Sequence, residues 1–190
     1  MFRDLVLANR SYRRFHESES IDEATLKSLV DLARCTPSAA NLQSLKYILS
    51  WTPHRNAVVF PTLSWAGYLT EWPGPGEGER PSAYIIILGD TRISKNFFCD
   101  HGIAAQTILL GATEKGYGGC MFGSINRDKL RAELAIDEHF EILLVIALGK
   151  PVEKVVLEEV GPDGSIKYYR DQTGVHHVPK RALDEIIVEK

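Results

Sequence analysis

The chain has 190 residues, 44% of them hydrophobic and 25% charged, and a formal net charge of −3 at pH 7. This length and balance are typical of one globular domain with a sizeable core, so we expect a single domain over residues 1–190. The net charge excludes the global basic field that attracts nucleic acids or anionic membranes, and any anion site must therefore be local.

The cysteines and the N-terminus indicate an intracellular protein. Cys35, Cys99 and Cys120 are too few and too widely spaced for a disulfide framework or a zinc site, so we expect reduced and mostly buried thiols. The N-terminus carries Arg3 and Asp4 and lacks the apolar core of a signal peptide. The longest apolar runs have only strand length. We therefore expect a cytoplasmic protein with no membrane or metal partner.

Apolar spacing predicts the elements of the first half of the chain. A short helix is expected to end near Asn9, and a stronger helix follows over residues 18–35, where Ser20 and Glu23 have capping-box spacing. Further elements are a strand at 45–51, a helix at 61–72, a loop at 72–81 and a buried strand at 82–90. Three glycines of that loop resemble a dinucleotide fingerprint, but the loop lacks the flanking strand and helix that such a site requires.

The second half begins with the longest predicted helix, residues 96–115, which is apolar on more than one face and has Gly116 as its C-cap. A short helix at 127–134, a buried strand at 141–149, a possible strand at 165–171 and a last helix beginning near Pro179 follow. Helices and strands alternate unevenly, which favours an α+β fold over a doubly wound sheet.

The stretch "NRSYRRF", residues 9–15, concentrates three arginines. In an extended chain Ser11 and Arg13 point to one side and Arg14 to the other, with Arg10 at the bend. Arginine forks match phosphate oxygens, so this segment could grip a phosphate. The alternative is a basic surface turn.

Two further segments are candidates for contact with a flat ligand. In "TPSAANLQS", residues 36–44, Asn41 and Gln43 can donate and accept hydrogen bonds at the edge of a heterocycle, although such residues are also common in loops. "KGYGGCMFGS", residues 115–124, has more glycines than a helix cap needs, and glycine permits close backbone approach. A loose turn after the helix is the alternative.

The end of the chain brings Lys180 and Arg181 into the first turn of the expected last helix. Basic side chains are unfavourable there unless an anion binds, because the helix dipole is positive at that end. His176 and His177 alternate faces and have no third ligand nearby, so a metal site is not expected.

These segments, in this order, resemble the FMN-dependent nitroreductase family: "NRSYRRF", "ARCTPSAANLQ", "GIAAQTILLGATEKGYGGCMFGSI", "VIALGKP" and "HHVPKRAL". The resemblance implies a three-layer fold with a largely antiparallel central sheet between helices, and an intertwined homodimer with FMN at the interface. It also implies that the Pro-Ser turn often reaches the flavin from the second subunit. The FMN-binding residues that it implies are Arg10, Ser11, Arg13, Pro37, Ser38, Asn41, Met121, Phe122, Gly123, Ser124, Lys180 and Arg181.

The activity that the resemblance implies is an oxidoreductase that passes electrons from NAD(P)H through FMN to a nitroaromatic, a quinone or a similar small acceptor. The sequence singles out no side-chain acid or base. Ser44 and Leu45 stand where the family often has Pro-Trp, so substrate preference is not transferred. Reductive dehalogenation, dehydrogenation and a non-catalytic FMN carrier or sensor are the alternatives.

Overall fold

A four-stranded antiparallel sheet forms the centre of the computed structural model, which describes residues 1–188. The strand order is β1 (Leu45–Ser50), β2 (Ala83–Asp90), β4 (Phe140–Gly149) and β3 (Gly118–Phe122). All eight residues of β2 are buried, as its unbroken apolar run predicts. The strands expected at 45–51, 82–90 and 141–149 are confirmed, and the glycine-rich stretch after the long helix adds the edge strand β3.

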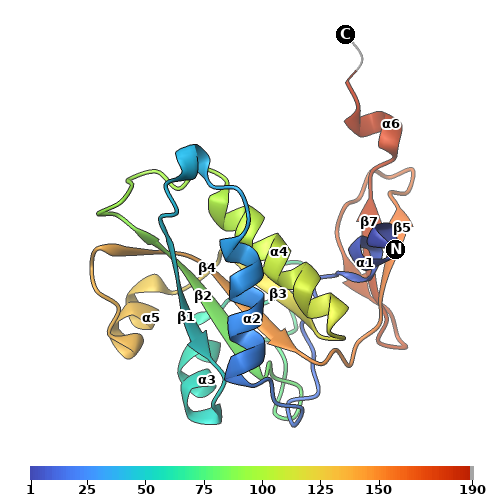
Figure 1. The fold of residues 1–190 in the computed structure, drawn as a ribbon. Coiled ribbons are helices and arrows are strands. Elements are labelled where there is room, and N and C mark those ends of the chain that lie inside the picture. Colours follow the sequence, from blue (N-terminus) through green and yellow to red (C-terminus); the bar gives the residue numbers. More distant parts are fainter. Residues whose placement is uncertain (189–190) are drawn as a thin grey trace.

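Helices cover both faces of this sheet (Figure 1). Ile85 and Ile87 of β2 pack in the core with α2 (Glu23–Arg34) and α4 (Asp100–Glu114). Tyr84 and Ile86 belong to the second core, on the side of α3 (Pro53–Val59) and α5 (Arg127–Leu134). Alternate residues of a strand point to opposite faces, so β2 contributes to both cores. The α+β class with three layers is thereby confirmed.

The long helix α4 is shorter than its predicted range of 96–115, because it begins only at Asp100. Gly116 follows its end with a φ of 78°, which confirms the expected C-terminal cap. The small residues allow α2 to approach closely, since a Cβ on Gly111 would lie 2.6 Å from Leu32 Cδ1. One side of α4 nevertheless stays exposed at Gly102, Ile103 and Gln106.

Two predictions in the first half of the chain are wrong. The cap of α2 is Asp22, whose carboxylate accepts a hydrogen bond from Thr25 N at 2.8 Å, and not the Ser20–Glu23 box. Residues 61–72 form a 3-10 turn, η2 (Phe60–Thr62), followed by irregular turns. The aromatic spacing there serves a local cluster, because Trp65 packs against Phe60, Trp72 and Phe122 with centroid distances of 4.7–6.2 Å.

A second, three-stranded sheet lies beside the first and has the order β5 (Val155–Glu159), β7 (His176–Lys180), β6 (Tyr169–Arg170). The strand expected at 165–171 is thus reduced to two residues. The last helix was predicted to begin at Pro179, but this residue lies in β7, which pairs in parallel with β5. The pairing continues through Glu158 with Pro179 and Glu159 with Lys180, so the chain stays extended beyond the predicted start of the helix. The dipole argument for an anion at Lys180 and Arg181 therefore does not apply.

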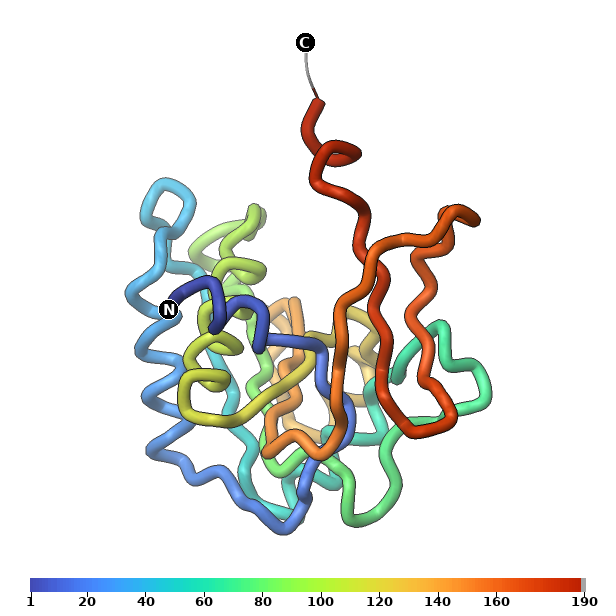
Figure 2. Tube along the Cα trace, turned by 90° about the vertical axis from the view of Figure 1, so that its right-hand side faces the viewer, coloured from blue at the N-terminus to red at the C-terminus, as the bar shows by residue number. Residues whose placement is uncertain are grey.

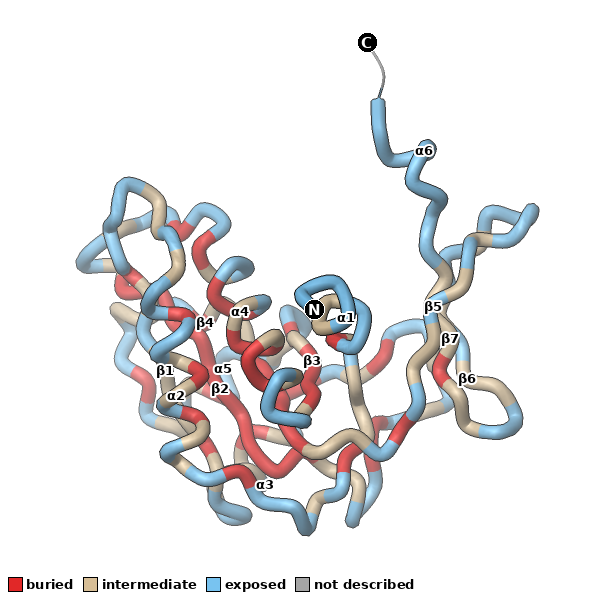
Figure 3. Tube along the Cα trace, turned by 45° about the vertical axis from the view of Figure 1, so that its right-hand side comes forward, coloured by how far each residue is buried: buried red, intermediate tan, exposed pale blue. Residues whose placement is uncertain are grey.

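Both ends of the chain flank this second sheet. The helix α1 (Phe2–Ala8) lies between α4 and the second sheet, and the segment after it joins β3 through a parallel bridge from Ser11 to Gly119 (Figure 3). After β7 the chain leaves the body, with the short helix α6 (Leu183–Ile186) in the projecting part (Figure 2).

The exposure of the thiols differs from the expectation. Cys120 is buried, but Cys35 and Cys99 are exposed, so the expectation of mostly buried thiols is wrong. Within residues 1–188 no helix has the length and apolar character needed to cross a bilayer.

Candidate functional site

A cavity of about 390 Å³ lies where α1, α4, β3 and the second sheet meet. It contains five of the predicted residues, namely Arg10, Ser11, Arg13, Met121 and Lys180. We call it the cationic cavity, and its other lining residues are Val6, Asn9, Gln106, Leu109, Val155, Tyr168, His176 and Val178.

Positive charge dominates this cavity. Arg10, Arg13 and Lys180 line it, and none of its described lining residues is an aspartate or a glutamate. Arg10 Nη2 donates to Val6 O at 2.7 Å, and Arg13 Nη1 lies 3.3 Å from Ser11 O. No carboxylate of residues 1–188 forms an ion pair with any of the three cations. Their charge is therefore available to an anionic ligand.

The segment after α1 has the extended conformation that its predicted alternation requires. Tyr12 N donates to Gly119 O at 3.0 Å, which fixes the segment along the edge of the central sheet. Arg13 then faces the cationic cavity, whereas Arg14 forms a two-point ion pair with Glu79, with Nε 2.7 Å from one carboxylate oxygen. The hydrogen bonds from Arg14 lower the pKa of Glu79. The prediction that Arg13 and Arg14 face opposite ways is confirmed.

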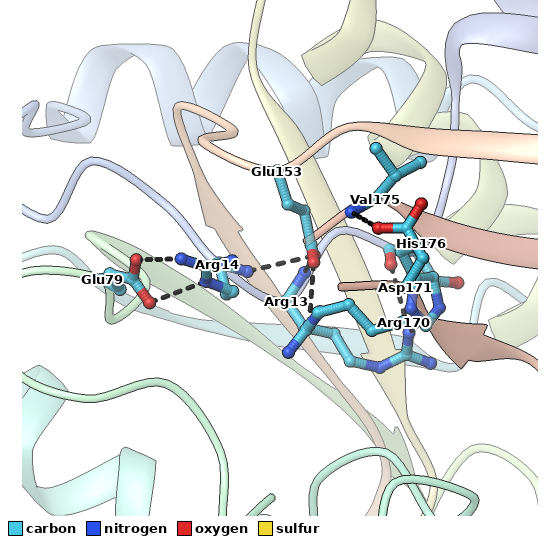
Figure 4. Close-up of polar contacts among 9 residues, drawn as sticks. Arg13, Arg14, Glu79, Glu153, Arg170, Asp171, Val175 and His176 are labelled. Carbon is cyan, nitrogen blue, oxygen red and sulfur yellow. Dashed lines mark hydrogen bonds and ion pairs between the residues drawn. The ribbon is translucent and has the colours of Figure 1, made fainter. Parts of the chain in front are cut away.

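Glu153 holds the backbone of this segment (Figure 4). Its Oε1 accepts hydrogen bonds from Arg13 N and from Arg14 N, the latter at 3.2 Å. Its Oε2 accepts from Arg170 Nη2 at 3.0 Å, and only 1% of its side chain is exposed. Glu153 is thus neutralised by Arg170 and by backbone N–H groups, which leaves the guanidinium of Arg13 without an ion-pair partner in the described chain.

His176 and Tyr168 complete the polar wall on the side of the second sheet. His176 is buried, with Nε2 3.5 Å from Arg13 Nη1, and its Nδ1 has no hydrogen-bond partner within residues 1–188. Burial lowers the pKa of His176, and the charge of Arg13 lowers it further, so the ring is neutral at pH 7. The Tyr168 ring lies 5.1 Å from Arg13 Cζ and 5.2 Å from the His176 ring.

The predicted Pro-Ser turn lies elsewhere, beside a smaller cavity of about 210 Å³ that Pro37 and Ser38 line. Ser38 Oγ donates to Asp100 Oδ2 at 2.6 Å, which ties the turn to the start of α4. Asn41 ends the 3-10 turn η1 (Ala39–Asn41) and is exposed. Ala40 and Asn41 both have positive φ, an unfavourable conformation for side chains with a Cβ. Within one chain, these residues do not join the cationic cavity.

One part of the glycine-rich stretch packs against the rest of the chain, and the other part is exposed. Gly118 and Gly119 allow close approach of other parts of the chain. A Cβ on Gly118 would lie 2.5 Å from the Tyr12 ring, and a Cβ on Gly119 would lie 2.4 Å from Ala147 O. Phe122 packs against Trp65 on the opposite face of β3 from Met121. Gly123 is exposed and has no atom of the described chain within 4 Å of an added Cβ.

Ser124 and Arg181 also lie outside the cationic cavity. Ser124 is exposed, and its carbonyl accepts a hydrogen bond from Ser64 N at 3.1 Å. Arg181 is exposed and pairs with Glu185 at 3.3 Å.

The sequence patterns missed Glu153, Tyr168, Arg170 and the role of His176. Each lies in the last quarter of the chain and meets the N-terminal segment only through the fold. A single buried carboxylate in "KPVEK" has no spacing that distinguishes it from an exposed one.

The family model described as "Nitroreductase family" matches residues 6–57 and 77–150, which is well over half of the chain. The chain belongs to the nitroreductase family. The recognition made on the ordered motifs is thereby confirmed, and an oxidoreductase is the coarse function that the family indicates.

Relatives agree with this assignment. YodC of Bacillus subtilis (strain 168), provisionally named an NAD(P)H nitroreductase, is 22% identical, and the alignment covers 79% of this chain and 89% of YodC. The crystal structure of a nitroreductase family protein from Streptococcus pneumoniae TIGR4 has a TM-score of 0.69 at 18% identity, and the match covers 100% of both chains. A nitroreductase-like structure from Exiguobacterium sibiricum 255-15, in complex with FMN, has a TM-score of 0.67 at 15% identity, with 80% of this chain and 89% of that chain covered.

Proposed function

We propose that the nitroreductase-family chain binds FMN in the cationic cavity and transfers electrons from NAD(P)H to a small acceptor, such as a nitroaromatic or a quinone. The observation that carries this proposal is the convergence of Arg10, Arg13 and Lys180 on a cavity with no described carboxylate in its lining. A phosphate monoester matches paired guanidinium donors and can accept from several cations at once.

The residues present fit the cofactor. Arg10 Nε and His176 Nδ1 are buried and have no hydrogen-bond partner within the described chain, so polar donors remain for a ligand. The volume of the cavity lies within the range of small-molecule sites, about 300–1,000 Å³. Leu109, Met121 and Val178 give the cavity an apolar wall that is available to the rest of the molecule. Bound FMN would supply the redox chemistry, and these residues would bind and orient it.

The remaining predicted residues fit a site shared by two copies. Pro37, Ser38 and Asn41 lie on a strained turn outside the cationic cavity, and a second copy of the chain would bring this turn to the flavin. Gly123 and Ser124 are exposed after β3, and in this proposal their main chain meets the flavin of the shared site. Phe122 is buried on the other face of β3, so only its main chain could take part. We therefore propose a homodimer with two flavin sites.

Three relations support the redox function: membership of the family, the name of YodC, and the FMN in the structure from Exiguobacterium sibiricum. The proposal assigns no side-chain acid or base. His176 lines the cavity, and its neutral ring faces Arg13, which suits binding of an anion and not proton donation.

The experiment is to purify the full chain, denature it and identify the released chromophore. We expect FMN, and bleaching of the yellow protein by NADH or NADPH without oxygen, followed by recovery of the colour when menadione is added. A chain that takes up no added FMN would contradict the proposed cofactor. A chain that binds FMN but whose reduced flavin resists menadione would be a carrier and not an enzyme.

A further inference from the structure

A separate cavity of about 430 Å³ lies next to α3, at the start of β2. It has no lining residue in common with the cationic cavity. Trp51, Pro53, Phe60 and Pro61 provide flat apolar walls. Phe60 and Pro61 belong to the segment between the two ranges that the family model matches, 6–57 and 77–150.

Three polar side chains in this cavity have hydrogen-bonding atoms without partners. Tyr84 is 0% exposed and Ser82 is 6% exposed, and neither hydroxyl has a partner within residues 1–188. Arg80 Nε is buried and has no partner there either. Buried hydroxyls and guanidinium N–H groups are almost always hydrogen-bonded to protein, water or a ligand, so three such atoms in one cavity mark a candidate binding site.

Two of the neighbouring polar side chains already form hydrogen bonds within the chain. Asn56 Nδ2 donates to Ser82 O at 2.7 Å, and its Oδ1 accepts from Ser50 Oγ at 2.8 Å. Glu17 Oε2 accepts from Gly78 N at 2.6 Å. Arg80, Ser82 and Tyr84 can all donate, which matches a ligand with an acceptor group.

Charge narrows the class of ligand. The Arg80 guanidinium lies over the Phe60 ring, 4.7 Å from its centroid, and makes no ion pair with a carboxylate of the described chain. Burial raises the pKa of Tyr84, so its hydroxyl stays a donor at any physiological pH. Glu17 also lines the cavity and repels any anion, so the single positive charge of Arg80 can offset one negative charge on a ligand but not two.

We propose that this cavity binds a small planar monocarboxylate, with the carboxylate at Arg80, Ser82 and Tyr84 and the flat apolar body against Trp51 and Phe60. Paired guanidinium N–H groups match a carboxylate, and an aromatic ring fits walls made of aromatic rings and prolines. The site is separate from the proposed flavin site and does not depend on it.

The test is a titration of the isotope-labelled chain with benzoate in the presence of excess FMN, followed by amide chemical shifts in NMR. We expect saturable shifts at residues 80–84 and near Trp51 and Phe60, and at least tenfold weaker binding of benzamide, the neutral analogue. The assigned shifts separate this cavity from the cationic cavity, where an anion could also bind. Shifts confined to the cationic cavity, or no saturable shifts, would overturn the proposal.

Variants make the test specific. Arg80→Gln removes the charge, and Tyr84→Phe removes only the hydroxyl; each should weaken benzoate binding fivefold or more. Arg55→Gln is the matched control, because Arg55 also lies in this region, on α3, but does not line the cavity; it should leave the affinity unchanged. If Tyr84→Phe fails to fold, Arg80→Gln still decides, because Arg80 is only half-buried. Equal binding of benzoate and benzamide, or unchanged binding to Arg80→Gln, would show that no carboxylate site exists.

Discussion

Glu153 fixes the backbone of two arginines in the N-terminal segment, although it lies far from them in the sequence. It accepts hydrogen bonds from the backbone of Arg13 and Arg14 and pairs with the side chain of Arg170. A buried carboxylate needs this many partners because its desolvation is costly. The charge of Glu153 is thereby compensated by other groups, and the side chain of Arg13 faces the ligand site.

We expect Glu153→Gln to lower the free energy of unfolding by about 3 kcal/mol, because it leaves Arg170 without its carboxylate in a buried position. Urea denaturation of the flavin-free chain measures this. Glu141→Gln is the control, since Glu141 is exposed on β4, and it should change stability by less than about 0.5 kcal/mol. Equal stability of the two variants would mean that Glu153 does not hold the segment.

Patterns in the sequence identified some of the site at this scale. Alternation in an extended segment was enough to place Arg13 and Arg14 on opposite sides. His176, Tyr168 and Arg170 could not be found in this way, because they reach the cavity through the second sheet, whose pairing is not local. Arg181, in contrast, was predicted beside the phosphate and lies on the exposed arm after β7.

Among the elements, the second sheet is held by an ionic clamp at His177. Its Nδ1 lies 3.0 Å from Glu158 of β5, and its Nε2 lies 3.1 Å from Asp171, just after β6. The hydrogen bond with Asp171, then that with Glu158, raises the pKa of His177. The same contact lowers the pKa of Asp171 to about 2. The clamp thus links β7 to β5 and to the residue that follows β6 through ion pairs of His177.

The pKa shifts give the clamp a defined pH dependence. Since the pKa of His177 is higher in the folded chain, its contribution is fully present below the unfolded value of about 6.5 and is lost as the pH rises through the folded value. We therefore expect the stability gap between wild type and His177→Gln to shrink from pH 6 to pH 9, measured by urea midpoints.

The comparison with His177→Gln also removes the effect of His176, whose lowered pKa acts in the opposite direction. His54→Gln, at an exposed histidine of α3, should keep the pH dependence of the wild type. A stability gap that is constant from pH 6 to pH 9 would contradict the clamp.

The elements that sequence periodicity predicted well are the buried ones. Strands β2 and β4 have unbroken apolar runs, and α4 has small and apolar residues on its packed side, so burial and pattern agree. The helix expected at 61–72 does not form. Trp65 and Trp72 instead pack in an aromatic cluster with Phe122, so the helical spacing of the aromatic residues in this segment is a coincidence. β7 was missed because Pro179 resembles a helix start, while its pairing with β5 cannot be seen locally.

At the scale of the whole molecule, the arm after β7 presents apolar side chains to solvent. Leu183, Ile186 and Val188 are 66%, 62% and 79% exposed, and this part of the chain stands away from the body (Figures 1 and 2). Exposed apolar patches of this kind mark interaction surfaces. The proposed homodimer would bury them against the second copy.

We expect the double variant Leu183→Glu and Ile186→Glu to be monomeric at micromolar concentration, because burying two carboxylates in an apolar interface is costly. Light scattering after size exclusion measures the mass. Ile166→Glu, at an exposed isoleucine in the loop before β6, should leave the dimer intact. A wild-type chain that is already monomeric would contradict both the dimer and the shared flavin site.

The phosphate site is tested most directly by titrating the flavin-free chain with FMN and with riboflavin, which lacks the phosphate. Arg13→Gln should weaken FMN binding about 10- to 100-fold, the loss of a charge-assisted hydrogen bond, and should leave riboflavin nearly unchanged. Arg14→Gln, whose side chain pairs with Glu79 on the opposite side, should change the affinities for the two ligands by the same factor. If Arg13→Gln weakens FMN and riboflavin equally, the cationic cavity does not bind the phosphate and the proposed orientation of the flavin is wrong.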